Sequence, residues 1–274
     1  MSYWKPASAE KGYQNVFALG EMTPYTGLGL IRLDSGESYQ GANAATNEAV
    51  LVILGGTCDI TVAGQKYTNL GKRKNVFDGP AASVYVPVSA AYEVTNTGTQ
   101  QLEIAVCQAL AEEAHEAFVI HPEDVLQQHR GILNMQRNVH DIVVNGYDQK
   151  VHRIIVGETY SFAGHWSSYP SHKHDTDIPG KEVVLDEIYY FQVNPAGGFG
   201  VQILYNDDDS LREAYMLRNG DATAIPHGYH PVGCAPGHQM YYLWVMAGKN
   251  GRKLQPNDDP KVAWIQNVAP MLKG

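Results

Sequence analysis

The sequence predicts an all-β protein made of two copies of one β-sandwich or barrel. Glycine (27), proline (14) and tyrosine (17) are abundant among the 274 residues, and only 18% are charged. This composition is typical of turn-rich β proteins rather than helical bundles. Short hydrophobic runs also recur at regular intervals between glycine turns. A hydrophobic content of 44% is enough for a sizeable core.

The strands are predicted in two series, after residues 1–20, which we expect to form an arm or an added strand. The first series comprises residues 28–33, 49–54, 58–62, 83–87 and 102–106. The second comprises residues 152–157, 187–193, 200–205, 213–217, 221–225 and 240–247. We therefore expect an N-terminal domain over residues 1–130 and a C-terminal domain over residues 131–274.

A connector and a tail complete the chain. Residues 110–145 are predicted as a partly helical connector, because residues 111–118 have helical composition and Pro122 suits the first position of a helix. Residues from Gly248 onward are predicted as a tail that lies on the body.

A weak internal repeat links the two series. Glu48 opens a strand of the first series as Glu187 opens one of the second, and Pro87 ends a strand as Pro226 does. Both pairs are 139 residues apart (187 minus 48 and 226 minus 87). The spacing favours two copies of one β fold.

Four side chains of the second copy form a predicted metal site. His172 and His174, at i and i+2, point to the same side of an extended segment. Glu187 and His230, from later strands, can meet them. Three imidazoles and one carboxylate suit a borderline divalent metal. No histidine occurs among the first 114 residues, so the first copy is predicted to be a scaffold without a metal.

Charge and cysteine content exclude several classes of protein. The net charge of −9 and the lack of a long Lys/Arg run argue against a nucleic-acid partner. Cys58, Cys107 and Cys234 are far apart and form no CxxC motif, which favours a reduced, cytoplasmic protein. We expect neither a secretory signal nor a membrane span, since no stretch approaches about 20 apolar residues.

The predicted ligands lie in two blocks that resemble the motifs of the cupin superfamily. Gly164, the HxH pair and Glu187 resemble the first motif, and Gly220, Pro226, Gly228 and His230 resemble the second. The loop between His174 and Glu187 is longer than is usual in cupins, which leaves Glu182 as a rival ligand. The final histidine also comes one residue early.

A narrower resemblance covers most of residues 150–250. The chain is similar to the uronate-isomerase family of bicupins, in its inositol-catabolism branch. The tryptophan-serine-serine-tyrosine run at residues 166–169 is the most specific part, and Ser171 departs from it where a second proline is expected. The other matching segments are residues 157–158, 164–175, 187–190, 198–202, 220–221, 226–231 and 241–248, with looser support from 73–79 and 85–87.

This resemblance implies an enzyme with a bicupin fold, which consists of two double-stranded β-helix domains. The implied reaction converts 5-deoxy-glucuronate, an aldose, into 5-dehydro-2-deoxy-gluconate. It also implies one divalent metal per chain, a small sugar-acid substrate and a homo-oligomer. Zinc is expected because no redox change is required, although the same ligands suit iron, manganese or nickel.

The remaining assignments in the second copy are weaker. Gln202, Tyr229 and Tyr242 are predicted sugar contacts, although a tyrosine is more often simply a core residue. Lys173 should face away from the metal, and His227 is expected on a surface turn. The acid–base residue is unknown. Four cations compete to bind the substrate carboxylate: Arg153, Lys181, Arg212 and Arg218.

Three other functions share this fold and these ligands. One is isomerisation of 5-keto-4-deoxyuronate in pectin breakdown, which substrate preference would distinguish. Another is metal-dependent oxygenation, which oxygen uptake would reveal. The third is a non-enzymatic sugar-binding or storage cupin, for which four intact ligands would be unnecessary. Fold alone does not choose among them.

Overall fold

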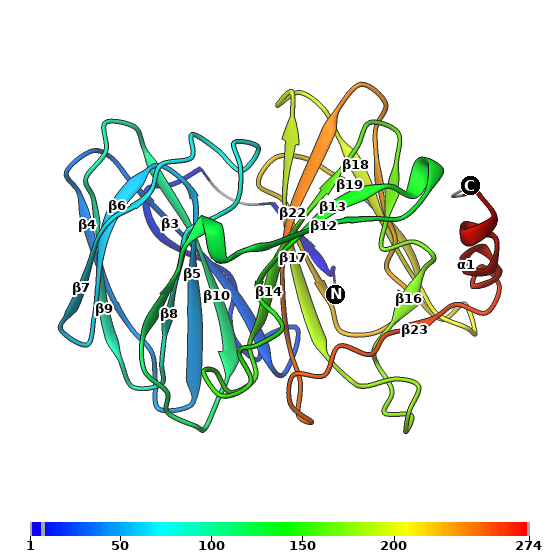
Figure 1. Ribbon diagram of the computed structural model, residues 1–274, viewed down its shortest axis with the longest axis horizontal. Coiled ribbons are helices and arrows are strands. Elements are labelled where there is room, and N and C mark those ends of the chain that lie inside the picture. The colour runs from blue at the N-terminus through cyan, green and yellow to red at the C-terminus, as the bar shows by residue number, and fades with distance from the viewer. Residues whose placement is uncertain (1, 7–8, 273–274) are drawn as a thin grey trace.

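Two β lobes lie side by side in the structure, a computed structural model that describes residues 2–6 and 9–272 (Figure 1). Each lobe has a large sheet that faces the other lobe and a smaller sheet on its outer side. The nearly all-β architecture confirms the predicted fold class. No helix in the described part of the chain is long and apolar enough to cross a membrane.

The first lobe is built from two sheets. The larger contains, in sheet order, β11 (Phe118–Ile120), β8 (Ser83–Val86), β5 (Asn47–Gly55), β10 (Leu102–Leu110), β3 (Thr26–Leu33) and β2 (Gly12–Phe17). The smaller contains β4 (Ser38–Ala42), β9 (Ala91–Asn96), β6 (Thr57–Val62) and β7 (Gln65–Gly71).

The second lobe repeats this plan. Its larger sheet contains β1 (Trp4–Lys5), β20 (Ala222–Ile225), β17 (Asp186–Asn194), β22 (Gln239–Ala247), β14 (Ile155–Ser161), β13 (Arg137–Val143) and β12 (Leu126–Arg130). Its outer sheet contains β15 (Trp166–Ser167), β21 (Val232–Cys234), β18 (Gly200–Tyr205) and β19 (Arg212–Leu217). A two-stranded ribbon joins β16 (His172–Lys173) to β23 (Asn257–Asp258).

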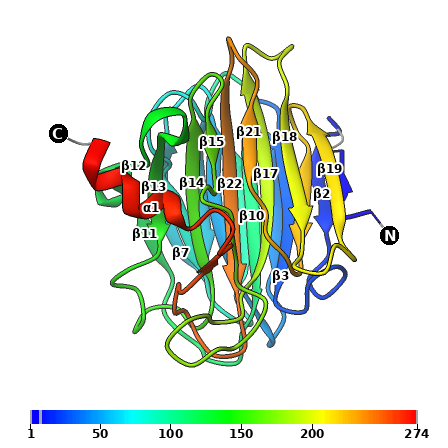
Figure 2. The same cartoon turned by 90° about the vertical axis from the view of Figure 1, so that its right-hand side faces the viewer.

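Helices are few and short. They are the 3₁₀ turns η1 (Pro122–Asp124), η2 (Leu133–Met135) and η3 (Ala269–Leu272), and the helix α1 (Trp264–Val268), which lies on the outer face of the second lobe (Figure 2). The predicted helical turn at Pro122 is η1. The predicted helical character of residues 111–118 is wrong, because so short a segment gains little from helix formation alone. Phe118 instead opens edge strand β11 and stacks on Tyr85 at 5.1 Å.

The chain crosses between lobes earlier than predicted. Strand β12 forms a hairpin with β13, so residues 126–130 belong to the second lobe, and a boundary after residue 130 divides this hairpin. The N-terminal strand β1 also pairs with β20 in the second lobe. The arm expected at the N-terminus therefore extends the sheet of the second copy.

Alternation along the large sheet of the second lobe separates two environments. One face, with Ile188 and Leu243, belongs to the same hydrophobic core as Val50 and Leu30 of the first lobe, so both lobes share this core. The opposite face, with Tyr189 among others, points into the second lobe. Because side chains alternate sides along a strand, one residue faces the core shared by the lobes and the next faces the interior of the second lobe.

The internal repeat is present, but Glu48 is not the counterpart of Glu187. Ala49 lies opposite Val86 and Glu187 lies opposite Ile225, and a proline follows each of these two partners. Ala49 therefore occupies the position of Glu187, and the register proposed from sequence is one residue off in this strand. A shift of one residue reverses the face that a side chain occupies.

Glu48 consequently points out of the first lobe and toward the second. Its fully buried carboxylate accepts hydrogen bonds from the backbone N–H groups of His152 (2.9 Å), Arg153 (2.6 Å) and Ile154 (2.9 Å), and from the Tyr85 hydroxyl (2.7 Å). This carboxylate therefore ties together the two lobes.

Candidate metal centre and pocket

Three of the four predicted ligands converge inside the second lobe. His174 follows β16, Glu187 lies in β17, and His230 precedes β21. The Nε2 atom of His174 is 3.1 Å from Glu187 Oε2, and His230 Nε2 is 3.4 Å from the same oxygen. All three residues are buried, and their ligand atoms lie within 4.8 Å of one another. The cluster is compatible with a metal site.

Hydrogen bonds to the backbone fix the imidazole tautomers of this cluster. His174 Nδ1 lies 2.6 Å from the Leu185 carbonyl oxygen and His230 Nδ1 lies 3.0 Å from that of Gly228. A carbonyl only accepts, so each Nδ1 carries the proton. Each Nε2 of a neutral ring then directs a lone pair at the Glu187 carboxylate. A cation between these atoms removes the repulsion, so the residues fit a divalent metal.

Two further observations support neutral imidazoles at His172 and His230. The Nε2 atom of His230 is buried and makes no hydrogen bond within the described part of the chain. Burial lowers the pKa of His230 to about 3, and burial followed by the charge of His174 lowers the pKa of His172 to about 3. Burial also acts to lower the pKa of His174, but contact with Glu187 raises it overall.

His172 lies beside the cluster, with ring centroids 4.9 Å from His230 and 6.4 Å from His174. It is only partly buried and lines the pocket described below. The structure thus brings the fourth predicted ligand to the edge of the group formed by the other three.

Glu182, the rival carboxylate, belongs to a separate network. Its Oε1 accepts hydrogen bonds from Lys173 Nζ (3.0 Å) and from the backbone N–H groups of Asp175 and Thr176 (2.8 Å each). Its Oε2 accepts one from Asn257 Nδ2 (2.9 Å). Lys173 faces away from the cluster, as predicted, and its ammonium group is held by the Glu182 carboxylate.

Gly228 shapes the turn that delivers His230. Its φ of +89° is in the left-handed region, and a Cβ there would lie 2.7 Å from the Tyr205 carbonyl oxygen. Its N–H donates to Asp175 Oδ2 at 2.8 Å. Only glycine satisfies both the conformation and the close approach, which explains this part of the second sequence block.

A pocket of about 390 Å³ opens beside the cluster. Its polar lining includes both members of the HxH pair and Glu187, with hydroxyl groups and two arginines. Apolar side chains and the C-terminal segment complete the wall. Besides the three ligands named, the lining residues are Arg130, Arg137, Val139, Asp141, Val144, Asn145, Thr159, Ser168, Leu185, Tyr189, Tyr242, Trp244, Met246, Leu254, Gln255 and Pro256.

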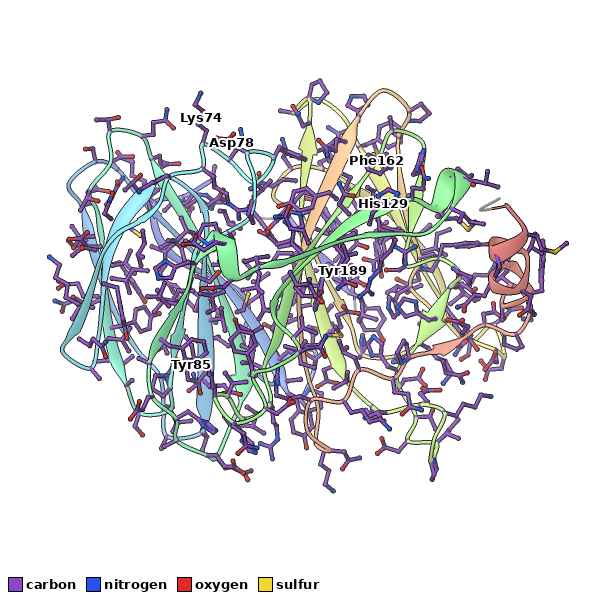
Figure 3. The ribbon with its side chains drawn as sticks, in the orientation of Figure 1. Lys74, Asp78, Tyr85, His129, Phe162 and Tyr189 are labelled. Carbon is purple, nitrogen blue, oxygen red and sulfur yellow. The ribbon has the colours of Figure 1, made fainter. Side chains whose placement is uncertain are left out.

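Ser168 joins two tyrosines in this pocket. Its Oγ is 3.3 Å from the Tyr189 hydroxyl and 3.4 Å from that of Tyr242, and Figure 3 labels Tyr189 within the second lobe. Burial raises the pKa of Tyr189 and that of Tyr242, so both hydroxyls stay protonated. Ser168 has a φ of +50°, which is strained for a non-glycine residue and is often found at functional sites.

The structure separates the three predicted sugar contacts. Tyr242 lines the pocket, whereas Gln202 and Tyr229 do not. Gln202 is a buried residue of β18 in the outer sheet, and it accepts a hydrogen bond from Thr223. Tyr229 is buried against Tyr205 and donates to Asp207 at 3.1 Å.

None of the four cations considered for the substrate carboxylate lines the pocket: Arg153, Lys181, Arg212 and Arg218. Sequence reasoning missed Arg130, Arg137 and Asp141, because residues 110–145 were interpreted as a connector. The spacing of Arg137, Val139 and Asp141 at i, i+2 and i+4 could have indicated one face of a strand. His227 is exposed, as predicted, and its ring meets Tyr3 edge-on at 6.0 Å.

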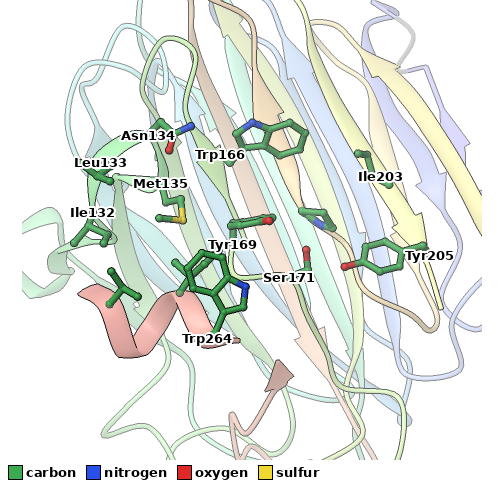
Figure 4. Close-up of a pocket in the computed structure, with 13 residues that line it drawn as sticks. Ile132, Leu133, Asn134, Met135, Trp166, Tyr169, Ser171, Ile203, Tyr205 and Trp264 are labelled. Carbon is green, nitrogen blue, oxygen red and sulfur yellow. The ribbon is translucent and has the colours of Figure 1, made fainter. Parts of the chain in front are cut away.

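A second cavity, of about 600 Å³, lies between α1 and the body of the second lobe (Figure 4). Its lining is largely apolar and includes Trp166, Tyr169 and Trp264. It lacks the converging histidines and carboxylate of the first pocket. The chemistry of the site therefore belongs to the smaller pocket.

Comparisons with known proteins agree with this architecture. The KduI/IolB family model matches residues 3–265. The 5-deoxy-glucuronate isomerase of Geobacillus kaustophilus (strain HTA426) is 38% identical over 242 residues, covering 88% of this chain and 86% of that protein. The protein of the same name from Halalkalibacterium halodurans is 35% identical over 268 residues, covering 95% and 97%.

Solved structures give the same result. An IolB-like protein from Salmonella typhimurium LT2 superposes with a TM-score of 0.90 at 35% identity, covering 96% of this chain and 98% of that one. Oxalate decarboxylase from Lactobacillus farciminis, with a TM-score of 0.64, 10% identity and coverage of 98% and 91%, shares the fold alone. The resemblance found in the sequence is confirmed: this chain belongs to the KduI/IolB family.

Proposed function

We propose that this protein is a metal-dependent isomerase that converts 5-deoxy-glucuronate into 5-dehydro-2-deoxy-gluconate. The observation that carries the proposal is the cluster of His174, Glu187 and His230 beside a pocket rich in hydroxyl groups, which His174 and Glu187 line. Curated relatives that match most of the chain bear the name of this activity. A sugar acid has the hydroxyl and carboxylate groups that such a pocket can bind.

His172, His174, Glu187 and His230 would hold one divalent ion. The ion would act as a Lewis acid that polarises the aldehyde and the neighbouring hydroxyl, which makes the C–H bond between them more acidic. Zinc fits because the reaction needs no redox change and the donors are nitrogen and oxygen. The three buried free cysteines favour a reducing, cytoplasmic setting for the enzyme.

The chemical balance is simple. A proton leaves the carbon that bears the hydroxyl, and a proton arrives at the aldehyde carbon. The proton of the neighbouring hydroxyl moves to the former aldehyde oxygen. The product has a ketone beside a primary alcohol, with no net oxidation and no co-substrate.

We propose that Asp141 is the base that removes the proton from the carbon that bears the hydroxyl and delivers it to the aldehyde carbon. This carboxyl lines the pocket, and its Oδ2 accepts a hydrogen bond from Gln128 Nε2 (2.6 Å). Its Oδ1 accepts no hydrogen bond from the described part of the chain. Burial raises the pKa of Asp141 above the ordinary aspartate value, which makes it a better proton acceptor than an exposed carboxylate. Asp141 can thus carry the proton from one carbon to the next.

Tyr242 and Ser168 would orient the sugar. Their hydroxyls are near each other on the pocket wall, and hydroxyl donors in a buried site can hydrogen-bond the oxygens on which negative charge develops. The indole of Trp244 is fixed by donation from Nε1 to Thr159 Oγ1 at 3.1 Å and limits the pocket on one side.

Metal removal and replacement test the proposal. The purified protein is stripped with a chelator, reloaded with zinc, iron, manganese or nickel, and assayed with 5-deoxy-glucuronate in a sealed cell with an oxygen electrode. We expect the keto isomer to form only after reloading, with no nucleotide and no oxygen consumed. Oxygen uptake equal to turnover would indicate an oxygenase. A higher kcat/KM for 5-keto-4-deoxyuronate would favour the pectin-pathway reaction.

A further inference from the structure

Arg137 is a cation without an anionic partner in the pocket. Its guanidinium is partly buried, and it forms no ion pair within residues 2–6 and 9–272. Its Nη1 donates to two backbone carbonyls, those of Met135 (3.1 Å) and Tyr169 (3.3 Å). Its Nε and Nη2 atoms have no acceptor in the described part of the chain. Half of the guanidinium is therefore anchored, and the other half is free to bind a ligand.

The turn before β13 is shaped to hold this side chain. Gly131 has a φ of +85°, and a Cβ there would lie 2.0 Å from the Met135 carbonyl oxygen and 2.9 Å from Arg137 Nη1. Only glycine permits this close approach. The anchored geometry restricts the guanidinium before any ligand arrives, so less conformational entropy is lost on binding.

Other cations near the site already have partners. Lys173 forms ion pairs with Asp175 and Glu182. Arg130 is exposed and donates to Gln128 Oε1, and the same Gln128 donates to Asp141. Among the cations of the described pocket residues, only Arg137 is both partly buried and without an acidic partner. Burial lowers the pKa of Arg137, which reflects the cost of holding this charge away from water.

The charges of the pocket favour an anionic ligand. Two arginines balance the carboxylates of Asp141 and Glu187, and a bound divalent cation would leave the pocket positive. Arg137 lines the same pocket as His172, His174 and Glu187, so its guanidinium and the cluster face one cavity.

We propose that Arg137 binds the carboxylate of the sugar acid and so determines both substrate class and orientation, with the aldehyde end directed to the metal cluster. This inference rests on the proposed isomerase function. In 5-deoxy-glucuronate the carboxylate and the aldehyde are at opposite ends of a six-carbon chain. A free Nε–Nη2 edge presents two parallel N–H donors, which match the two oxygens of a carboxylate.

A pair of substrates tests the role of Arg137. One is 5-deoxy-glucuronate, and the other is its neutral analogue, in which a hydroxymethyl group replaces the carboxylate. The wild-type protein should favour the acid strongly in kcat/KM. In Arg137→Met, kcat/KM for the acid should fall about tenfold to a hundredfold, as expected for loss of a charged hydrogen bond, while that for the neutral analogue changes little. Arg137→Lys should recover only part of the loss because lysine lacks the planar fork.

Two controls keep the result interpretable. Arg212→Met removes an exposed arginine outside the pocket and should leave the preference for the acid intact. Metal content and thermal midpoint of each variant show whether it is folded and loaded. An equal loss on both substrates in a folded, loaded Arg137→Met would overturn the inference, because it would show that Arg137 only supports the structure.

Direct binding separates this inference from the proposed function. The probe is the reduced substrate, in which the aldehyde is a primary alcohol, measured by titration calorimetry with metal-loaded protein. We expect binding that weakens about tenfold to a hundredfold in Arg137→Met. If wild-type protein binds this acid through Arg137 but does not isomerise the substrate, the isomerase proposal fails and the carboxylate site stands. Unchanged affinity in Arg137→Met would contradict the carboxylate site.

Discussion

Glu187 and Glu182 are five positions apart, yet their carboxylates meet opposite environments. The Oε1 atom of Glu182 accepts hydrogen bonds from a lysine and two backbone N–H groups, and its Oε2 atom accepts one from an amide. The Oε2 atom of Glu187 instead faces the Nε2 atoms of His174 and His230. Four donors hold the Glu182 carboxylate in its own network, whereas the Glu187 carboxylate faces two imidazole nitrogens with which it could share a metal.

Substitution of each glutamate should separate these roles. Glu187→Ala should lower metal content and activity together, because removal of one ligand from a four-ligand site usually costs most of the affinity. Glu182→Gln keeps the shape of the side chain and should retain about one metal per chain by elemental analysis. Full occupancy in Glu187→Ala together with loss in Glu182→Gln would show that the wrong carboxylate was chosen.

Asp141 should control the acidic side of the pH profile. It must be ionised to accept a proton, so activity should fall as the pH drops through its pKa. Because burial raises that pKa, the fall should occur above the ordinary value of about 3.9. Asp141→Asn should reduce kcat about 10²- to 10⁴-fold with metal content unchanged. A kcat close to wild type would remove Asp141 from the mechanism.

The grouping of His174, Glu187 and His230 could be predicted from sequence, because residue type, spacing and flanking glycines indicate it directly. Arg137 and Asp141 were not, since a strand that alternates arginine, valine and aspartate has no motif and lies far from the histidines in sequence. The internal repeat was aligned one residue off at Glu48, because both Glu48 and Ala49 lie beside the same hydrophobic run. Only the pairing of Ala49 with Val86 settles which side chain faces inward.

At the scale of elements, the C-terminal tail supports the strand that carries the first histidine. Strand β23 pairs with β16, so that Asp258 lies opposite His172 and Asn257 opposite Lys173. The N–H of Asp259 donates to the Ser171 carbonyl at 2.8 Å, and the Tyr205 hydroxyl donates to Asp259 Oδ2 at 2.7 Å. The sequence predicted a tail on the body, but pairing with the ligand strand is visible only in the structure.

Two truncations test this support. A chain that ends at residue 261 lacks α1 but keeps β23, and it should bind metal as the full chain does. A chain that ends at residue 253 loses β23 and should bind metal at least tenfold more weakly, because β16 then has no strand partner in the described structure. Equal metal affinity of the two truncated proteins, measured by competition with a chromogenic chelator, would show that β16 needs no such support.

At the scale of the whole molecule, the first lobe supplies partners to buried groups of the second. Arg73 Nη2 donates to Glu158 Oε1 at 2.7 Å, and the hydroxyls of Tyr241 and Tyr160 donate to the same carboxylate at 2.9 and 3.1 Å. Both charged side chains are almost fully buried. Glu158 and Tyr241 are adjacent to Thr159 and Tyr242, which line the pocket from the opposite face of the sheet. The first lobe thus holds the strands that form the site.

Loss of the arginine should destabilise the whole fold. Arg73→Met leaves Glu158 buried without its charge partner, which should cost about 3–5 kcal/mol in the free energy of unfolding. Burial acts to raise the pKa of Glu158, but Arg73 and the hydrogen bonds lower it to about 2. Its stabilising contribution is therefore present above the ordinary glutamate pKa of about 4.3 and is lost as the pH falls toward 2.

Denaturant titrations of wild type, Arg73→Met and Glu158→Gln at pH 7 and pH 3 measure these effects. Glu158→Gln should flatten the acid part of the pH dependence. An Arg73→Met protein as stable as wild type would mean that the interface does not depend on this ion pair.

The two-lobe architecture was predictable because composition and strand spacing depend on local chemistry. The shared core was not, since Val50 and Leu51 are both buried and their sequence does not tell which one faces the partner lobe. The interlobe bonds of Glu48 and Arg73 were equally hidden, because their partners are more than 80 residues away.

Isomerisation in heavy water, followed by proton NMR, tests the central claim most directly. Metal-loaded protein is given 5-deoxy-glucuronate with no nucleotide. The account predicts that the keto isomer appears and that the carbon that gains hydrogen carries some solvent deuterium, because a proton held by a pocket carboxylate can exchange with solvent before it is returned. The result that would contradict the account is a loaded, folded protein that leaves 5-deoxy-glucuronate unchanged.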